Sequence, residues 1–125
     1  MPTSRQLLGQ VGEDLTARWY LEHGYEVVAR NWRCPYGEAD IIARRQRLVV
    51  VCEVKTRSDL RFGTPAEAVT QARQARLRRT ASAYLQDRAG LKESAGLPFS
   101  RGVAVVRFDV AEVMYGTVSV IEAAF

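Results

Sequence analysis

Hydrophobic residues recur along the first half of the chain with two different periods. Over residues 4–23 they recur at helical spacing, through Leu8, Val11, Leu15 and Trp19, and Gly24 then provides a stop signal. Apolar runs bounded by turn residues predict three strands, at 25–33, 38–44 and 48–55. The run that begins at Leu48 is apolar on both faces, which is typical of a central strand.

In the second half of the chain, a segment with helix signals is again followed by apolar runs typical of strands. Thr64-Pro65-Ala66-Glu67 has the form of a capping box with proline at the first helical position, so a helix is expected from Pro65 to about Arg88, with a break near Thr70. Residues 89–100 contain Gly, Ser and Pro and are expected to form an exposed loop. Strands are expected at 103–113 and 117–123. The order αβββαββ predicts an α/β fold with a mixed central sheet flanked by helices, in one domain over residues 1–125.

Length, charge and hydrophobic content place only broad limits on the class of protein. The chain has 125 residues, a formal net charge of +4 and 47% hydrophobic residues, which suits one globular domain with a modest preference for polyanions. Arginine supplies nearly all the positive charge, because Lys55 and Lys92 are the only lysines. A basic nucleic-acid-binding protein and an ordinary, slightly basic protein both fit this balance.

Several alternatives are disfavoured by what the sequence lacks. His23 is the only histidine, so a zinc site of histidine and cysteine is not expected. No secretion signal precedes Cys34 and Cys52, so two reduced thiols in the cytoplasm fit better than a disulfide. No stretch is long and apolar enough to cross a membrane.

Two carboxylates in neighbouring strands carry the chemical signal. Glu53 lies at the end of a buried strand, where an uncompensated carboxylate costs several kcal/mol. If Gln46 and Arg47 form a two-residue turn, Asp40 lies opposite Glu53, with Cβ atoms roughly 5 Å apart. Two carboxylates this close repel unless a proton or a cation lies between them. Hard oxygen ligands with open positions suit Mg²⁺ or Mn²⁺, and the carbonyl of Val54 is a further candidate ligand.

Lys55 completes this pattern. It lies two residues beyond Glu53 and therefore on the same face of the strand. There it would position a water molecule or neutralise negative charge that develops on a phosphate. A simple salt bridge to Glu53 or Asp40 is the alternative explanation, and the preceding Gly37-Glu38-Ala39-Asp40 strand favours a catalytic site.

The spacing from Asp40 to Glu53-Val54-Lys55 resembles the PD-(D/E)XK nucleases, and among them the archaeal Holliday-junction resolvases. Over nearly its full length the chain looks like the bacterial YraN family, a group described as endonuclease-like. The matching motifs are Gly12-Glu13, Gly24-Tyr25, Arg30-Asn31, Gly37-Glu38-Ala39-Asp40, Glu53-Val54-Lys55-Thr56-Arg57, Gly63-Thr64-Pro65, Ala81 with Tyr84-Leu85, Arg107-Phe108-Asp109-Val110 and Ala124-Phe125. The resemblance implies a restriction-endonuclease-like core and a metal-dependent nuclease that acts on DNA, including branched DNA such as Holliday junctions.

The resemblance also implies roles for residues outside the strands. A glutamate on the first helix completes the metal site in the resolvases, and Glu13 matches it here. Glu13 falls on a small-residue face with Gly9 and Thr16, which suits a cleft or a solvated surface equally. Many members of the family carry a lysine in the second helix where this chain has Arg73. Arginine does not deprotonate, so a phosphate clamp fits Arg73 and a general base does not.

Other arginines offer candidate contacts to nucleic acid. Arg57 and Arg61 flank the predicted site in a loop, where phosphate contacts are expected. Arg76, Arg78 and Arg79 extend the basic stretch of the second helix, which suits either a nucleic-acid track or a solvated face. Two further hypotheses stay open, a non-catalytic nucleic-acid-binding module and a protein-interaction domain. The small size leaves room for a homodimer or a partner protein.

Overall fold

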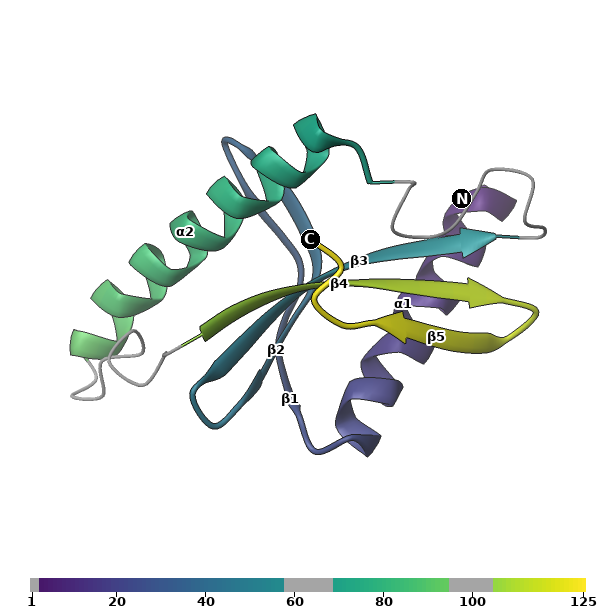
Figure 1. Cartoon of the computed structure of the whole chain (residues 1–125), viewed down its shortest axis with the longest axis horizontal. Coiled ribbons are helices and arrows are strands. Elements are labelled where there is room, and N and C mark those ends of the chain that lie inside the picture. The colour runs from purple at the N-terminus through teal and green to yellow at the C-terminus, as the bar shows by residue number, and fades with distance from the viewer. Residues whose placement is uncertain (1–2, 58–68, 95–104) are drawn as a thin grey trace.

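The computed structural model describes residues 3–57, 69–94 and 105–125, without the side chains of residues 5 and 88–94. Across these ranges two helices and five strands follow one another in the predicted order αβββαββ (Figure 1). They are α1 (Ser4–Glu22), β1 (Glu26–Cys34), β2 (Gly37–Arg45), β3 (Leu48–Arg57), α2 (Gln71–Ser94), β4 (Val105–Met114) and β5 (Thr117–Ile121). The α/β fold predicted from the sequence is therefore confirmed, and it is compatible with a restriction-endonuclease-like core.

The five strands form one mixed sheet in the order β1-β2-β3-β4-β5. Of these strands β3 and β4 pair in parallel, because the chain returns through α2 between them, whereas the other neighbours are antiparallel. The predicted central strand is confirmed, since Val49, Val50, Val51, Cys52 and Glu53 of β3 are all buried. A strand buried on both faces needs apolar residues at every position, which makes the charge of Glu53 exceptional.

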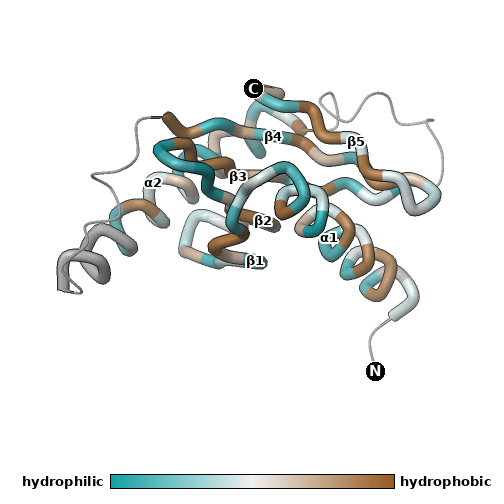
Figure 2. Tube along the Cα trace, turned by 90° about the horizontal axis from the view of Figure 1, so that it is seen from below, coloured by the Kyte–Doolittle hydropathy of each residue, from teal (hydrophilic) through white to brown (hydrophobic). Residues whose placement is uncertain are grey.

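The two helices cover opposite faces of the sheet. Leu77, Ala81 and Tyr84 of α2 pack on one face with Val51 and Phe108. On the other face Ala17 and Tyr20 of α1 pack with strand residues such as Ile41, Val50 and Cys52. The molecule therefore has three layers, with the sheet between the helices (Figures 1 and 2). No helix in the described ranges is both long and apolar enough to cross a membrane.

The first helix packs through a different face from the one its apolar stripe suggests. Thr16, Ala17 and Tyr20 are buried, whereas Leu8 and Val11 are 53% and 52% exposed. Figure 2 shows brown, hydrophobic segments along α1. Helical periodicity predicted the helix correctly. The residues that pack against the sheet, however, are Thr16, Ala17 and Tyr20 and not the apolar stripe.

The second helix spans Gln71–Ser94 in the described residues and ends later than predicted. Its expected start at Pro65 lies outside the described residues, and Val69 and Thr70 are not helical. The non-helical Thr70 is compatible with the break expected near it, and the Thr70 hydroxyl accepts the backbone N–H of Arg73 at 3.2 Å as an N-cap. The helix continues to Ser94 rather than ending near Arg88, so the predicted loop cannot begin at residue 89.

Candidate active site

Asp40 and Glu53 face each other where the β2–β3 ladder ends. Backbone pairing runs from Arg45 and Leu48, next to the two-residue turn, to Ile41 and Cys52. The next step of this register places Asp40 opposite Glu53, as the turn predicted. Here the carboxylate of Asp40 accepts the backbone N–H of Val54 at 2.8 Å. The side chain of Asp40 therefore binds a backbone donor of β3 at the point where the strands separate.

The environment of Asp40 disfavours its charged form. Burial and the nearby charge of Glu53 raise the pKa of Asp40 from 3.8 to about 7, against the opposing effect of the Val54 N–H. The charge of Glu13 acts in the same direction as that of Glu53. At neutral pH Asp40 is therefore protonated in a substantial fraction of molecules. A cation placed between the two carboxylates would relieve the same repulsion.

Arg73 of α2 compensates the buried charge of Glu53. Glu53 is only 5% exposed, and its Oε2 atom lies 2.9 Å from both Nε and Nη2 of Arg73. Burial alone would lower the pKa of Arg73, but the hydrogen bond and charge of Glu53 outweigh burial and raise it. Arg73 also donates to the carbonyl of Glu38 at 3.5 Å. Arg73, which the sequence predicts to clamp a phosphate, is thus paired with Glu53, a predicted metal ligand. A cation bound at Glu53 would compete with Arg73.

Lys55 shares the α2 face of β3 with Glu53 but is not paired with it. Within the described part of the chain, no ion pair joins Lys55 to Glu53 or Asp40, so the salt bridge considered as an alternative is not formed. In the parallel register Lys55 lies beside Glu112 of β4. The Oε1 atom of Glu112 is buried and has no hydrogen-bond partner among the described residues. A buried carboxylate oxygen without a hydrogen-bond partner therefore belongs to the residue that pairs with Lys55 in the register.

Sequence reasoning missed Glu112 for an identifiable reason. It lies in a strand that was predicted, and a carboxylate within an otherwise apolar strand is a signal that could have drawn attention to it. Its position beside Lys55, however, depends on parallel pairing between strands that are separated by the whole of α2.

Helix α1 approaches the same end of the sheet at Gly12. A Cβ atom at this position would clash with Oγ1 of Thr56, so only glycine permits the contact as it stands. The next residue, Glu13, is partly exposed and acts on Asp40 through its charge. However, the described residues contain no group of three His, Cys, Asp or Glu side chains close enough to hold a metal ion. The structure brings Asp40 and Glu53 together as a pair and leaves Glu13 outside it.

The structure gives less information on the other residues predicted to belong to the site. Arg57 is partly buried at the end of β3, four residues beyond Glu53. Arg61 lies outside the described residues. Val54 contributes its N–H to Asp40, and its carbonyl as a metal ligand stays a prediction.

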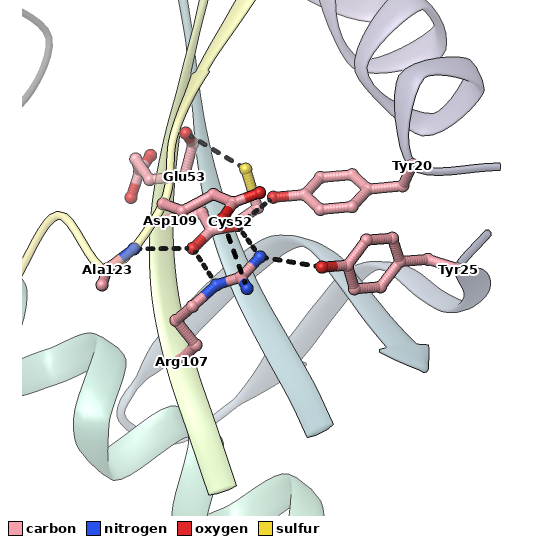
Figure 3. Close-up of polar contacts among 8 residues, drawn as sticks. Tyr20, Tyr25, Cys52, Glu53, Arg107, Asp109 and Ala123 are labelled. Carbon is pink, nitrogen blue, oxygen red and sulfur yellow. Dashed lines mark hydrogen bonds and ion pairs between the residues drawn. The ribbon is translucent and has the colours of Figure 1, made fainter. Parts of the chain in front are cut away.

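A buried polar cluster supports β3 and β4 beneath the site (Figure 3). The fully buried carboxylate of Asp109 accepts the Tyr20 hydroxyl at 2.7 Å, the Nε and Nη2 atoms of Arg107 at 2.8 and 2.9 Å, and the N–H of Ala123 at 3.1 Å. Arg107 also donates to the hydroxyl of Tyr25 at 3.1 Å. Arg107 and Asp109 therefore form an ion pair within the sheet. The cluster ties α1, β4 and the segment after β5 together.

The two cysteines are free thiols, as expected. Cys52 lies next to Glu53, and its Sγ atom is 3.6 Å from the carbonyl of that residue (Figure 3). Burial raises the pKa of the Cys52 thiol, so it behaves as a packing residue and not as a nucleophile.

Comparison with known proteins identifies the family. The model of "Uncharacterised protein family UPF0102" matches residues 12–113, which include every described residue of the site. The chain belongs to the UPF0102 family. The YraN family inferred from the motifs is this same family, so that prediction is confirmed.

Relatives within UPF0102 extend the match over the whole chain. A UPF0102 protein of Moorella thermoacetica is 42% identical over 125 residues, covering 100% of both chains. A UPF0102 protein of Nocardia farcinica is 46% identical over 110 residues, which is 88% of this chain and 78% of the relative. A third, from Nocardioides sp., is 55% identical over 84 residues, or 67% of this chain and 68% of the relative. The family description carries no activity, so the site itself must support any function.

Proposed function

We propose that this UPF0102 protein is a Mg²⁺- or Mn²⁺-dependent nuclease that hydrolyses phosphodiester bonds in DNA, including branched DNA. The observation that carries the proposal is the Asp40–Glu53 pair on adjacent strands, with the pKa of Asp40 raised to about 7 and Lys55 on the same face as Glu53. Paired carboxylates with a lysine on the same strand face match the needs of phosphodiester hydrolysis, where negative charge develops on a phosphate oxygen.

The donor set fits a divalent cation. Asp40 and Glu53 would hold it, with the Val54 carbonyl and, by the resemblance, Glu13 as further ligands. Mg²⁺ commonly uses one or two carboxylates and fills its other positions with water and substrate phosphate, so a third carboxylate is not required. When bound, the cation lowers the pKa of a coordinated water and stabilises charge on the phosphate.

The protein's own groups have separate roles in this proposal. Lys55 orients the attacking water or neutralises charge on the phosphate, since a compact ammonium with three donors suits either task. Arg73 pairs with Glu53. If Glu53 held a cation, Arg73 would be available to contact a phosphate, as predicted from the sequence, and Arg57 and Arg61 would add further phosphate contacts. Two free thiols agree with action in the cytoplasm.

The test replaces Lys55 with methionine, which keeps the apolar stem and removes the charge. Cleavage is measured with Mg²⁺ or Mn²⁺ on linear duplexes, single strands, flaps and four-way junctions. We expect the Lys55→Met variant to lose about 10²–10³-fold in cleavage rate while its fold and DNA affinity are retained. The matched control is Arg47→Met, which removes an exposed charge at the β2–β3 turn. Equal cleavage by both variants would remove Lys55 from the mechanism.

A second candidate function is a nucleic-acid-binding module that keeps the fold without catalysis. The ion pair of Arg73 with Glu53 favours it, because this arrangement satisfies the buried carboxylate without a metal. Binding without cleavage of any substrate on the panel, in either metal, would support this second function.

A further inference from the structure

A groove separate from the carboxylate pair lies between the β1–β2 turn and the outer side of α2. Its volume is about 400 Å³, and it is lined by Tyr36, Arg78, Arg79, Ser82, Ala83 and Gln86. None of these described lining residues is acidic, so a negatively charged ligand meets no repulsion from them. We refer to these six residues as the Tyr36 groove.

The walls of the Tyr36 groove are held together by contacts between the hairpin and the helix. Trp32 of β1 packs edge-to-face on Tyr84 of α2, with ring centroids 5.2 Å apart. Cys34 Sγ lies 3.8 Å from the hydroxyl of Thr80, and a Cβ at Gly37 would lie 3.6 Å from the same hydroxyl. The turn that carries Tyr36 is therefore docked on α2, yet Tyr36 itself is 51% exposed.

The two arginines of the groove, Arg78 and Arg79, are placed where they can contact a ligand. The guanidinium of Arg78 lies over the rings of Phe108 and Phe125, 4.9 and 5.5 Å from their centroids. Such stacking fixes the orientation of an arginine and leaves its N–H donors available to a phosphate. Arg79 is exposed one residue further along the helix.

We propose that the Tyr36 groove binds a single-stranded segment of nucleic acid. A base stacks on the ring of Tyr36, and Arg78 and Arg79 contact the flanking phosphates. Exposed aromatic rings combined with basic side chains recognise single strands in this way, because every base offers a face for stacking and every nucleotide a phosphate. This inference rests on the proposed function and specifies its substrate.

The location of the groove agrees with a strand that continues into the carboxylate site. Tyr36 lies in the turn before β2 and precedes Asp40 by four residues, which span at most roughly 13 Å at about 3.3 Å per residue. Arg73 and Arg79 lie about 9 Å apart along α2 at ~1.5 Å per residue. At about 3.4 Å per stacked nucleotide these lengths correspond to roughly three or four nucleotides. We therefore infer that the substrate carries a single-stranded tail beside the bond to be cut.

The experiment measures binding by fluorescence anisotropy in EDTA, so that cleavage does not contribute. The probes are a blunt DNA duplex and the same duplex with a single-stranded tail of about five nucleotides, enough to span both sites. We expect Tyr36→Ala to weaken binding of the tailed duplex about tenfold and to leave the blunt duplex unchanged, whereas Tyr36→Phe retains the preference for the tail. Arg79→Gln should lower the dependence of the tailed complex on salt by about one phosphate contact.

Matched controls lie at other turns of the sheet. Tyr115→Ala removes an exposed tyrosine at the β4–β5 turn, and Arg47→Gln an exposed arginine at the β2–β3 turn. Both should leave the preference for the tail intact. Circular dichroism melting establishes that each variant is folded, and Tyr36→Phe provides the test of stacking if Tyr36→Ala is unstable.

The outcomes separate this inference from the nuclease proposal. A wild-type protein without preference for the tail, or an equal loss in the Tyr115→Ala control, overturns the groove assignment even if DNA is cleaved. Conversely, a tail preference that depends on Tyr36 in a protein that cleaves nothing supports the groove and refutes the nuclease. Loss of tail binding on Tyr36→Phe would overturn stacking as the mode of recognition.

Discussion

Replacing Asp40 with asparagine tests the electrostatics of the carboxylate pair directly. In the metal-free protein, burial and the charge of Glu53 raise the pKa of Asp40 from 3.8 to about 7. The folded state therefore holds this proton more tightly than the unfolded state does. The stability that results is fully present below the unfolded pKa and is lost as pH rises through about 7.

The magnitude follows from the two pKa values. The difference between 3.8 and about 7 corresponds to at most about 4 kcal/mol. Between about pH 4.5 and pH 8 the wild type should lose about 3 kcal/mol of unfolding free energy from this group. An asparagine side chain does not titrate, and its oxygen can still accept the N–H of Val54. Relative to the wild type, the Asp40→Asn variant should therefore gain about 3 kcal/mol of stability over this interval.

The assay is urea unfolding in EDTA at intervals from about pH 4.5 to pH 8, the range over which the linkage acts. Taking the difference between wild type and variant cancels the titration of the shared groups that do not interact with Asp40. Asp14→Asn is the matched control, because Asp14 is an exposed carboxylate on α1 whose partner is Arg30. A difference between wild type and Asp40→Asn that stays constant with pH would refute the proposed repulsion. In a separate series without EDTA, Mn²⁺ should stabilise the wild type most at about pH 8, where Asp40 is charged, and should stabilise the variant much less.

Three further predictions concern the surroundings of the site. Arg73→Gln should destabilise the metal-free protein by about 3 kcal/mol, because it leaves Glu53 buried without its cation, and should tighten Mn²⁺ binding measured by calorimetry. An unchanged Mn²⁺ affinity would mean that arginine and metal do not compete. Asp109→Asn should cost about 3–5 kcal/mol in urea unfolding, since the carboxylate accepts four hydrogen bonds from donors. Gly12→Ala should cost about 1–3 kcal/mol, and Thr56→Ala in the same chain should recover most of it if the clash is the cause.

The register of the carboxylate pair is the part of the site that local sequence determines. A hairpin with a two-residue turn has only one pairing, so the turn at Gln46 and Arg47 dictates that Asp40 lies opposite Glu53. The alternation of side chains along a strand then places Lys55 on the face of Glu53. These relations involve neighbours along the chain, and periodicity and turn chemistry are sufficient to predict them.

The contacts that give the site its chemistry were decided by packing between distant segments. Arg73 reaches Glu53 only because α2 packs on that face of the sheet, and Glu112 lies beside Lys55 only because β3 and β4 pair in parallel. Neither relation has a local signature, since Arg73 and Glu53 are 20 positions apart and the whole of α2 separates Lys55 from Glu112.

Helix α1 shows the same division between sequence and tertiary structure. Its apolar spacing predicted a helix, but the buried face contains Thr16, Ala17 and Tyr20, while Leu8 and Val11 stay exposed. A helix packs through the side chains that let it approach the sheet, and that choice depends on the shape of the opposing surface. Sequence alone therefore determined the elements and the pairing of the two carboxylates. Tertiary structure decided which charges compensate them, because compensation in a buried site requires groups that are brought together only when the layers close.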